Sequence, residues 1–457
     1  MGRPLTGSEE PASPAIARFP GITVLLAWST IVAALGGFLF GFDTAVIAGT
    51  TRSLSHVFSL SPQTLGLTVS SALWGTIVGA AFAGQAADRW GRRDSLRVLA
   101  LLYVLSAVGC GLAWSWPSLL FFRILGGVGI GGSSVLGPMY IAEIAPAPRR
   151  GILVGVFQFN IVAGILVAYL SNYLISLEGL ATREWRWQFG VAAGPAVLFS
   201  LLLMTIPRSP RWLVKRGRMV EAAAVLAKLG EYNVQLGLAA ITASVAHDRG
   251  AGDDRLFSVK NGFPIFLAVS IAAFSQLSGI NAVLYYLNDI FSAAGFTNIS
   301  AGIQAVIIGF TNLTFTVIAM LLIDKIGRRT LLLLGSLGMA CTLMGIAEIF
   351  AAQSHRDLLL WLLIAYCASF AFSLGAVTWV YMSEVFPNAV RAKGQSLGSL
   401  AHWIMNAAIA GIFPAMAARS GATPFVFFAL MMIVLFFVVL MVYPETKNRP
   451  LEKMSFR

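Results

Sequence analysis

The sequence Asp88-Arg89-Trp90-Gly91-Arg92-Arg93 returns 236 residues later as Asp324-Lys325-Ile326-Gly327-Arg328-Arg329. A second motif, Met139-Tyr140-Ile141-Ala142-Glu143, returns 241 residues later as Val380-Tyr381-Met382-Ser383-Glu384. In both places an arginine, Arg150 or Arg391, stands seven residues after the glutamate. Two independent motifs that repeat at nearly one spacing indicate a chain built from two similar halves.

The composition excludes a water-soluble enzyme. Of the 457 residues, 57% are hydrophobic and 11% are charged, and the mean hydropathy is +0.79. A soluble protein of this length would be about a quarter charged. The three cysteines, Cys110, Cys341 and Cys367, all lie in apolar stretches, which predicts packing roles and indicates neither a disulfide framework nor a metal site. We expect an all-α membrane protein without a cofactor.

Apolar stretches of about 20 residues or more recur along the whole chain, and each is long enough to cross a bilayer as a helix. They predict twelve transmembrane helices in two six-helix bundles. The predicted helices cover 21–50, 62–87, 96–114, 117–142, 152–177, 187–207, 261–293, 301–323, 330–351, 358–383, 394–417 and 423–442. Parallel halves of this kind are typical of secondary transporters, whose substrate site lies between them at the membrane midplane.

The basic residues predict the orientation of these helices. If the N-terminus is inside, 26 of the 32 Lys and Arg residues fall in the tails or in the inner loops. The positive-inside rule then puts both termini in the cytosol, and the net charge of +12 becomes an orientation signal next to the lipid bilayer rather than a sign of nucleic acid. The predicted segments are a tail over 1–20, a bundle over 21–207, a cytosolic loop with short amphipathic helices over 208–260, a bundle over 261–445 and a tail over 446–457.

With these motifs in place, the sequence resembles the sugar porter family of the major facilitator superfamily over nearly its whole length. Besides the two repeated motifs, the resemblance rests on six stretches. They are Gly37 to Asp43, Arg123 to Glu143, Pro207 to Leu213, Gln276 to Asn281, Asn312 to Thr316 and Tyr443 to Lys447. The resemblance implies the major facilitator fold and sugar transport.

Four positions depart from the family pattern. In the closing motif, Asn448 stands where glycine is usual. Arg208 stands where relatives usually carry a glutamate, a change that bears on one cytosolic salt bridge. Ser275 replaces the first of two glutamines, a change that bears on sugar specificity. Ala376 replaces the proline that usually follows Gly375.

Asp43 and Arg123 are the charged residues within the first and fourth predicted helices. Counted from the outer helix ends, each lies about seven residues, or ~10 Å, deep. Opposite charges at one depth inside a membrane are cheapest when they pair, and such groups often mark proton paths. A static ion pair that locks two helices is the alternative. The resemblance favours proton coupling, because proton-coupled sugar porters carry an aspartate at the position of Asp43 and passive animal glucose carriers an asparagine.

Polar side chains near mid-membrane predict the substrate site. Gln276, Asn312, His402 and Asn406 reach a similar depth in three predicted helices, and Asn and Gln suit hydroxyl-rich ligands because they both donate and accept. For any one of them alone, an interhelical hydrogen bond is the simpler explanation. Together with the resemblance, they predict a substrate-binding set of Gln158, Gln276, Asn281, Asn312, Trp379, His402, Trp403 and Asn406. The resemblance also implies an outer gate at Tyr285 and Tyr286, with core packing as the alternative.

The charges of the repeated motifs predict a cytosolic gate. Exposed ion pairs contribute only ~0–1 kcal/mol each, so a role in stability is unpersuasive. Pairs that form between the halves on closure and break on opening would bias the conformational equilibrium. The predicted gate set is Asp88, Arg89, Arg92, Arg93, Glu143, Arg150, Asp324, Arg328, Arg329, Glu384, Arg391 and Glu445.

These observations predict a proton-coupled monosaccharide symporter in a bacterial inner membrane, working by alternating access. The partners would be a hexose, a pentose or a polyol, and a proton. A passive facilitator for a sugar or polyol would keep the sugar contacts but would not need the acid opposite Arg123. A sugar sensor built on the same scaffold is the other alternative, although only 12 residues follow Glu445.

Overall fold

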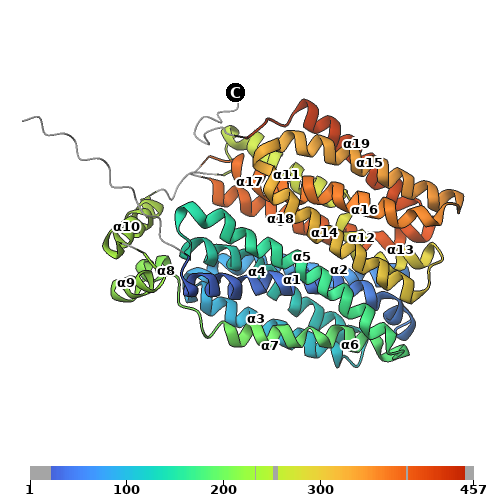
Figure 1. The fold of residues 1–457 in the computed structure, drawn as a ribbon, viewed down its shortest axis with the longest axis horizontal. Helices are drawn as coiled ribbons and strands as arrows, with labels where there is room; N and C mark the ends of the chain where they lie inside the picture. Colours follow the sequence, from blue (N-terminus) through green and yellow to red (C-terminus); the bar gives the residue numbers. More distant parts are fainter. Residues whose placement is uncertain (1–21, 232, 251–255, 388–389, 448–457) are drawn as a thin grey trace, which may run out of the picture.

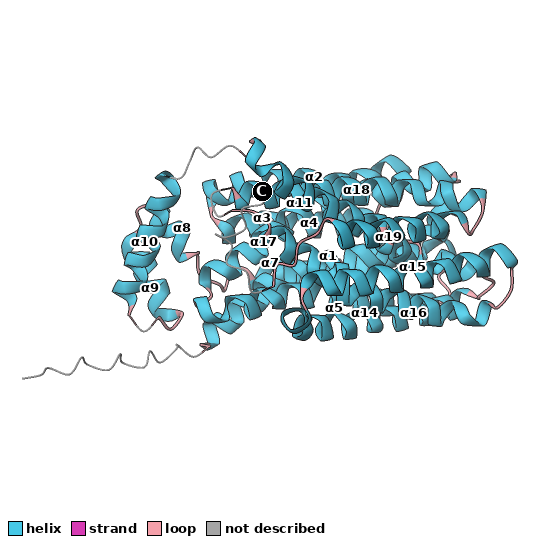
Figure 2. Ribbon diagram, turned by 90° about the horizontal axis from the view of Figure 1, so that it is seen from above, coloured by secondary structure: helices cyan, strands magenta, loops and turns pink. Residues whose placement is uncertain are grey.

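In a computed structural model of the protein, the structure describes residues 22–231, 233–250, 256–387 and 390–447. Within these ranges every regular element is helical, and Figure 2 shows most of the helices running along one common direction. The predicted tails over 1–20 and most of 446–457 lie outside the described residues. The predicted all-helical fold class is therefore confirmed for the part of the chain that the structure describes.

The first half of the chain forms one bundle, drawn from blue to green in Figure 1. Its helices are α1 (Val24–Val57), α2 (Pro62–Trp90), α3 (Arg92–Gly111), α4 (Trp116–Ile144), α5 (Arg150–Leu177), α6 (Glu184–Val191) and α7 (Ala193–Leu202). Three further helices lie at one end of this bundle: α8 (Pro210–Lys215), α9 (Met219–Lys228) and α10 (Val234–Gly250). We call this end the α8–α10 end and the opposite one the far end.

The second half forms the other bundle, drawn from yellow to red. Its helices are α11 (Gly262–Leu277), α12 (Ile280–Tyr285), α13 (Leu287–Ala293), α14 (Asn298–Ile326), α15 (Arg328–Ala352), α16 (Leu359–Phe370), α17 (Ala376–Glu384), α18 (Arg391–Arg419) and α19 (Thr423–Met441). A π-helical segment, Ala371–Gly375, joins α16 to α17.

Eleven helices in the described residues are long and apolar enough to cross a membrane. The sixth predicted helix, over 187–207, instead consists of α6 and α7, which meet at Ala192. Pro195 explains the break, because proline has no N–H to donate to the carbonyl of Val191. The seventh, predicted over 261–293 as one helix, is interrupted at Gly279, whose φ of +84° lies in the left-handed region, and again at Tyr286.

The repeated motif has the same backbone shape in both halves. Gly91 separates α2 from α3 with φ +89°, and Gly327 separates α14 from α15 with φ +100°. In each case the arginine after the glycine donates back to the preceding helix, Arg92 to the carbonyl of Ala87 and Arg328 to that of Ile323, at 3.2 Å in both. The repeat in the sequence is therefore a repeat in structure.

The two halves pack tightly at the far end. A Cβ atom on Gly66 of α2 would lie 1.9 Å from the carbonyl oxygen of Gly411 of α18, so the two backbones touch there. Tyr169 of α5 donates to the carbonyl of Leu284 of α12 at 2.7 Å. One apolar core runs through both halves in this region, whereas the first bundle has a separate core toward the α8–α10 end. The two halves are thus in close contact at the far end.

Candidate functional site

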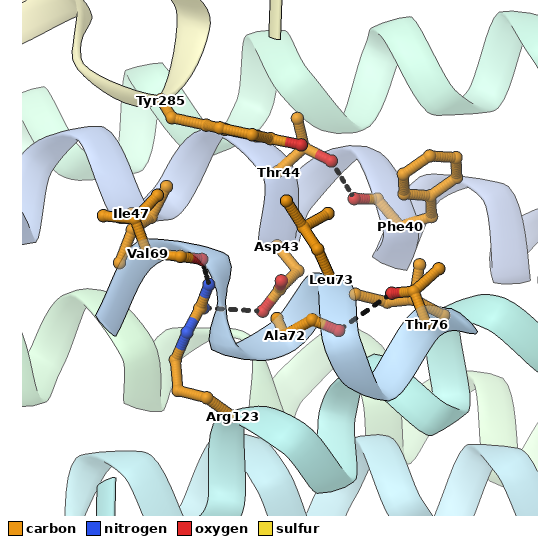
Figure 3. Close-up of a pocket in the computed structure, with 11 residues that line it drawn as sticks. Phe40, Asp43, Thr44, Ile47, Val69, Ala72, Leu73, Thr76, Arg123 and Tyr285 are labelled. Carbon is orange, nitrogen blue, oxygen red and sulfur yellow. Dashed lines mark hydrogen bonds and ion pairs between the residues drawn. The ribbon is translucent and has the colours of Figure 1, made fainter. Parts of the chain in front are cut away.

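Arg123 and Asp43 form an ion pair inside the first bundle. The Nη1 atom of Arg123 lies 3.2 Å from Oδ1 of Asp43, and Nη2 donates to the carbonyl of Val69 at 3.4 Å (Figure 3). The Arg123 side chain is 3% exposed, and its guanidinium faces the ring of Phe189 at 5.4 Å. This is the pairing that equal depth in the sequence predicts. A proton-coupling role for the two residues stays a prediction.

The ion pair borders a small cavity between the halves. Besides Asp43 and Arg123, its walls include Thr44 of α1, Thr76 of α2 and Tyr285 of α12, a residue of the second bundle (Figure 3). The hydroxyl of Tyr285 and the amide of Asn406 are in hydrogen-bond contact at 3.2 Å. A tyrosine of the second bundle thus lines the same cavity as the Asp43 carboxylate.

Gln276 is the centre of a polar chain in the second bundle. Its Oε1 accepts from Nδ2 of Asn281 at 2.8 Å, and its Nε2 lies 3.1 Å from a ring nitrogen of His402. An amide nitrogen only donates, so the facing nitrogen of His402 must accept, which requires the neutral ring. The break at Gly279 lies between Gln276 and Asn281 and allows one helix region to present both side chains.

Aromatic rings surround His402. The ring centroid of Trp379 lies 4.9 Å from that of His402, and Trp403 lies 5.3 Å from it on another side. Trp403 also contacts Phe40 of α1, across the boundary between the halves, at 5.4 Å. Trp379 is 41% exposed although it lies within the membrane-spanning region of the chain. A polar edge beside aromatic faces can hold a ring that carries hydroxyl groups on an apolar frame.

The remaining residues of the predicted substrate set have no such partners. Gln158 lies on α5 and Asn312 on α14, where Asn312 is 7% exposed. Neither side chain makes a hydrogen bond to another residue that the structure describes. Their role in binding a substrate therefore stays a prediction.

Tyr285 and Tyr286 are both buried where α12 meets α13. Tyr286 donates to the carbonyl of Ala410 at 3.0 Å and stacks on Phe413 at 4.9 Å. Tyr285 contacts Asn406 and lines the cavity beside Asp43. Their packing is compatible with a closed outer gate and with plain core packing, so the gating role stays a prediction.

Near the α8–α10 end, each half contains the same buried ion pair. Arg92 Nη2 lies 2.9 Å from Glu143 in the first half, and Arg328 Nη2 lies 2.9 Å from Glu384 in the second. In the second half, Glu445 accepts from the backbone N–H of both Arg328 and Arg329 at 3.0 Å. Each of these contacts stays within its own half. The predicted pairs between halves are not present among the described residues in this conformation.

The other members of the predicted gate set have different surroundings. Asp88 pairs with Lys215 of α8 at 2.9 Å, and Arg93 pairs with Asp94 at the same distance. Arg391 donates to the carbonyl of Phe386 at 3.4 Å, while Arg89 and Arg150 are exposed. The side chain of Asp324 lies outside the described residues.

Two contacts at this end were not foreseen from the sequence. Arg208 pairs with Asp94 of α3 at 3.0 Å, and its effect on the salt bridge of the family glutamate stays a prediction. Ser209 donates to the Glu143 carboxylate while its Oγ also accepts from the backbone N–H of Trp212 at the start of α8. The motif from Pro207 to Arg211 contains Ser209, but the sequence does not show that this residue meets Glu143. That contact depends on the packing of α8 against the end of α4.

Comparisons with known proteins agree with this geometry. The family described as "Sugar (and other) transporter" matches residues 29–456. The D-xylose-proton symporter of Escherichia coli (strain K12) is 39% identical, over 93% of this chain and 94% of its own length. The arabinose-proton symporter of Bacillus subtilis (strain 168) is 36% identical, over 95% of each chain. A solved structure of the xylose transporter XylE from E. coli, in a partially occluded inward open conformation, has a TM-score of 0.84 at 37% identity and covers 94% of this chain and 100% of that one.

Proposed function

The chain belongs to the sugar transporter family of the major facilitator superfamily, and we propose that it is a proton-coupled monosaccharide symporter that works by alternating access. One observation carries the proposal. Tyr285 borders the same cavity as the Asp43–Arg123 pair and also contacts Asn406 of the predicted substrate set. A change in the charge of Asp43 can therefore reach the polar site through a single side chain.

We infer that α6 and α7 together form one membrane span, which gives twelve spans in two bundles, 21–207 and 261–445. The α8–α10 end is then cytosolic, because the basic motifs and the loop over 208–260 gather there. The far end faces the outside. Relatives that are named as bacterial sugar-proton symporters support a place in a bacterial inner membrane.

The conformation is inward-facing in this proposal. The halves contact each other at the far end, through Gly66 and Gly411, and the charged motifs near the cytosol pair within their own halves. Similarity to the inward open XylE structure supports the same state. On closure of the cytosolic side, Arg92, Glu143, Arg328 and Glu384 would exchange partners across the halves and act as the cytosolic gate.

The sugar would bind between Gln276, Asn281, His402 and the face of Trp379. Its hydroxyls would replace the internal chain from Asn281 through Gln276 to His402, and Asn312 and Gln158 would supply further amide groups. D-xylose and arabinose are the first substrates to test, since the relatives are named as D-xylose-proton and arabinose-proton symporters. Hexoses and polyols follow as competitors.

The proton would bind to Asp43. An ionised Asp43 holds Arg123, whereas a carboxylate that loses the arginine in an apolar site must take up a proton, because the charged form is poorly solvated there. Binding of the proton thus becomes a condition for the movement that separates the pair. The ion pair is not merely structural in this proposal, because its partners must part in each cycle.

Asp43→Asn tests the proposal in proteoliposomes. The mutant mimics the protonated form, so we expect it to exchange labelled xylose for unlabelled xylose across the membrane while losing accumulation driven by a pH gradient. Arg123→Ala should damage transport more, because it leaves a buried acid without its partner. Full uphill transport by Asp43→Asn would refute symport through Asp43. Equilibration without accumulation in the wild type would identify a passive facilitator, and binding without any flux a sensor.

A further inference from the structure

Three arginines surround one carboxylate where α3 begins. The Oδ1 atom of Asp94 lies 2.9 Å from Nε of Arg93 and 3.1 Å from Nη1 of Arg97, and its Oδ2 lies 3.0 Å from Nη2 of Arg208. We call these four residues the α3 arginine cluster. Three positive charges and one negative charge give the cluster a net charge of +2. Like charges this close repel each other, so a further anion would stabilise the cluster.

The second half of the chain has an acid at the matching position. Pro207-Arg208-Ser209 returns 237 residues later as Pro444-Glu445-Thr446, and in both places the hydroxyl donates to the glutamate of the repeated motif. Glu445 accepts from the backbone N–H groups of the first two residues of α15 at 3.0 Å. No side chain caps the start of α3 in this way. The first half therefore lacks a carboxylate that the second half has at the same place.

The cluster lies at the level of the bilayer surface. Arg93 and Arg97 both donate to backbone carbonyls of 203–206, the segment that follows α7, at 3.3 and 3.2 Å. Trp28 donates to the hydroxyl of Thr205 in the same segment at 2.8 Å and is partly exposed. Tryptophans with an apolar ring and a satisfied N–H are typical of the interface between a bilayer and water. The cluster is therefore placed where lipid headgroups lie.

Exposed apolar side chains continue from the cluster toward the middle of the membrane. Leu101 and Leu105 follow Arg97 at intervals of four residues on α3, and they are 54% and 55% exposed. On the neighbouring α7, which packs against α3, Leu201 is exposed as well. A charged cluster at the end of an exposed apolar strip matches the two parts of a phospholipid, a charged headgroup and its acyl chains.

We propose that the α3 arginine cluster binds the phosphate of an anionic phospholipid, whose acyl chains lie on the exposed side chains of α3 and α7. In the orientation proposed above, this lipid belongs to the cytosolic leaflet. The Nη2 atom of Arg93 and the Nη1 atom of Arg208 have no hydrogen-bond partner in the part of the chain that the structure describes. Both can donate to phosphate oxygens, to which guanidinium groups form strong charge-assisted hydrogen bonds.

The carboxylate of the cluster determines which headgroup fits. Asp94 accepts two N–H contacts from Arg208 and one each from Arg93 and Arg97, and a carboxylate has about four such positions. No position is left for the ammonium group of a zwitterionic lipid, and the positive charge of that group would also meet the net positive charge of the cluster. A headgroup without a cation, such as that of phosphatidylglycerol, is therefore favoured.

Native mass spectrometry of the delipidated full-length protein tests the site, with phosphatidylglycerol or phosphatidylethanolamine added in detergent. We expect the wild type to bind phosphatidylglycerol more tightly than phosphatidylethanolamine. Arg97→Gln combined with Arg208→Gln brings the charge of the cluster to zero and should weaken phosphatidylglycerol binding roughly fivefold for each arginine removed. Equal affinity of the wild type and this double variant, or equal affinity of the wild type for both lipids, would overturn the proposal.

Two further double variants serve as controls. Arg216→Gln combined with Arg218→Gln removes the same number of charges between α8 and α9, where Arg218 pairs with Glu221, and should bind the lipid as the wild type does. Arg97→Lys combined with Arg208→Lys keeps the charge of the cluster and should retain most of the binding, because lysine holds phosphate as a point charge. Melting temperatures without lipid show that each variant is folded. A lysine variant as weak as the glutamine variant would contradict binding by charge.

Glycerol phosphate, a headgroup without acyl chains, distinguishes a lipid from a free phosphate ester. Phosphatidylglycerol should raise the melting temperature of the wild type more than that of the Arg97→Gln, Arg208→Gln variant, because a ligand stabilises the form that binds it. Glycerol phosphate at the same concentration should leave both melting temperatures unchanged. An equal rise with glycerol phosphate would show that the acyl chains contribute nothing and would overturn the lipid assignment. These measurements involve neither sugar nor protons, so their outcome is independent of the Asp43→Asn experiment.

Discussion

Single residues near the substrate site act through chains of hydrogen bonds. Gln276 accepts from Asn281 and faces His402, so the orientation of its amide is determined from both sides. Because Asn281 occupies the oxygen, the amide nitrogen must point toward the histidine. A sugar that replaces either neighbour would meet a group already oriented to receive it.

Replacing Gln276 by alanine should therefore weaken monosaccharide binding by about 1–3 kcal/mol, the value of a lost hydrogen bond to a buried polar group. Isothermal titration calorimetry with the purified protein measures the change. Gln353→Ala, in an exposed turn where the side chain donates to Phe350, is the control and should bind as the wild type does. Wild-type affinity in a folded Gln276→Ala protein would show that the site lies elsewhere.

At the α8–α10 end, the salt bridge of Arg208 leads to a prediction about stability. Its guanidinium pairs with Asp94, so Arg208→Glu would place two carboxylates together. The pair is partly exposed, and we expect a loss of stability on the order of 1 kcal/mol, visible as a lower melting temperature. Arg208→Gln removes the charge without adding a second carboxylate, so it should lose less stability than Arg208→Glu, since Arg93 and Arg97 still pair with Asp94. An Arg208→Glu variant that melts with the wild type would show that the pair contributes nothing.

At the scale of elements, the interruptions in the helices matter more than the helices themselves. Hydropathy predicts the long apolar spans well, because any residue of sufficient apolarity contributes to them. It does not detect the breaks at Gly279 and beside Pro195, which depend on one backbone angle and one missing N–H. The same limit applies to side-chain partners. Equal depth was enough to pair Asp43 with Arg123, but helix rotation decides that Tyr285 meets Asn406 and that Arg208 meets Asp94.

Gly279→Ala should disturb the break between α11 and α12. The residue has φ +84°, and an added Cβ would lie 2.2 Å from the ring of Phe428. Strain of this kind costs about 1–3 kcal/mol before the clash is counted, so we expect a lower melting temperature and weaker sugar binding. Gly262→Ala, at the start of α11 with open space around it, is the matched control. If both variants melted alike, the break would tolerate a side chain.

At the scale of the molecule, the two halves are built alike but contact each other unequally. The repeated glycine turns and the Arg–Glu pairs give both bundles one design near the α8–α10 end. At the far end, α2 and α18 cross in close contact. A conformational change that opens the far end must separate these helices.

Gly66→Leu should prevent that far-end contact, because a side chain there would meet the backbone of Gly411. We expect an outward-open population, with far-end distances between spin labels on α2 and α18 increased, sugar binding retained and transport lost. Gly84 lies on the same helix, and an added Cβ there would have no atom within 4 Å, so Gly84→Leu should change neither the distances between the labels nor transport. Unaltered distances in Gly66→Leu would mean that the two bundles can adjust to the added side chain.

The apolar core that crosses both halves at the far end has a thermal consequence. Opening the far end would expose part of that core to water, and hydration of apolar surface raises the heat capacity. The inward-facing and outward-facing forms therefore differ in heat capacity as well as in shape. Because hydrophobic contact weakens on cooling, the preferred orientation of the carrier depends on temperature even when sugar and proton concentrations stay constant.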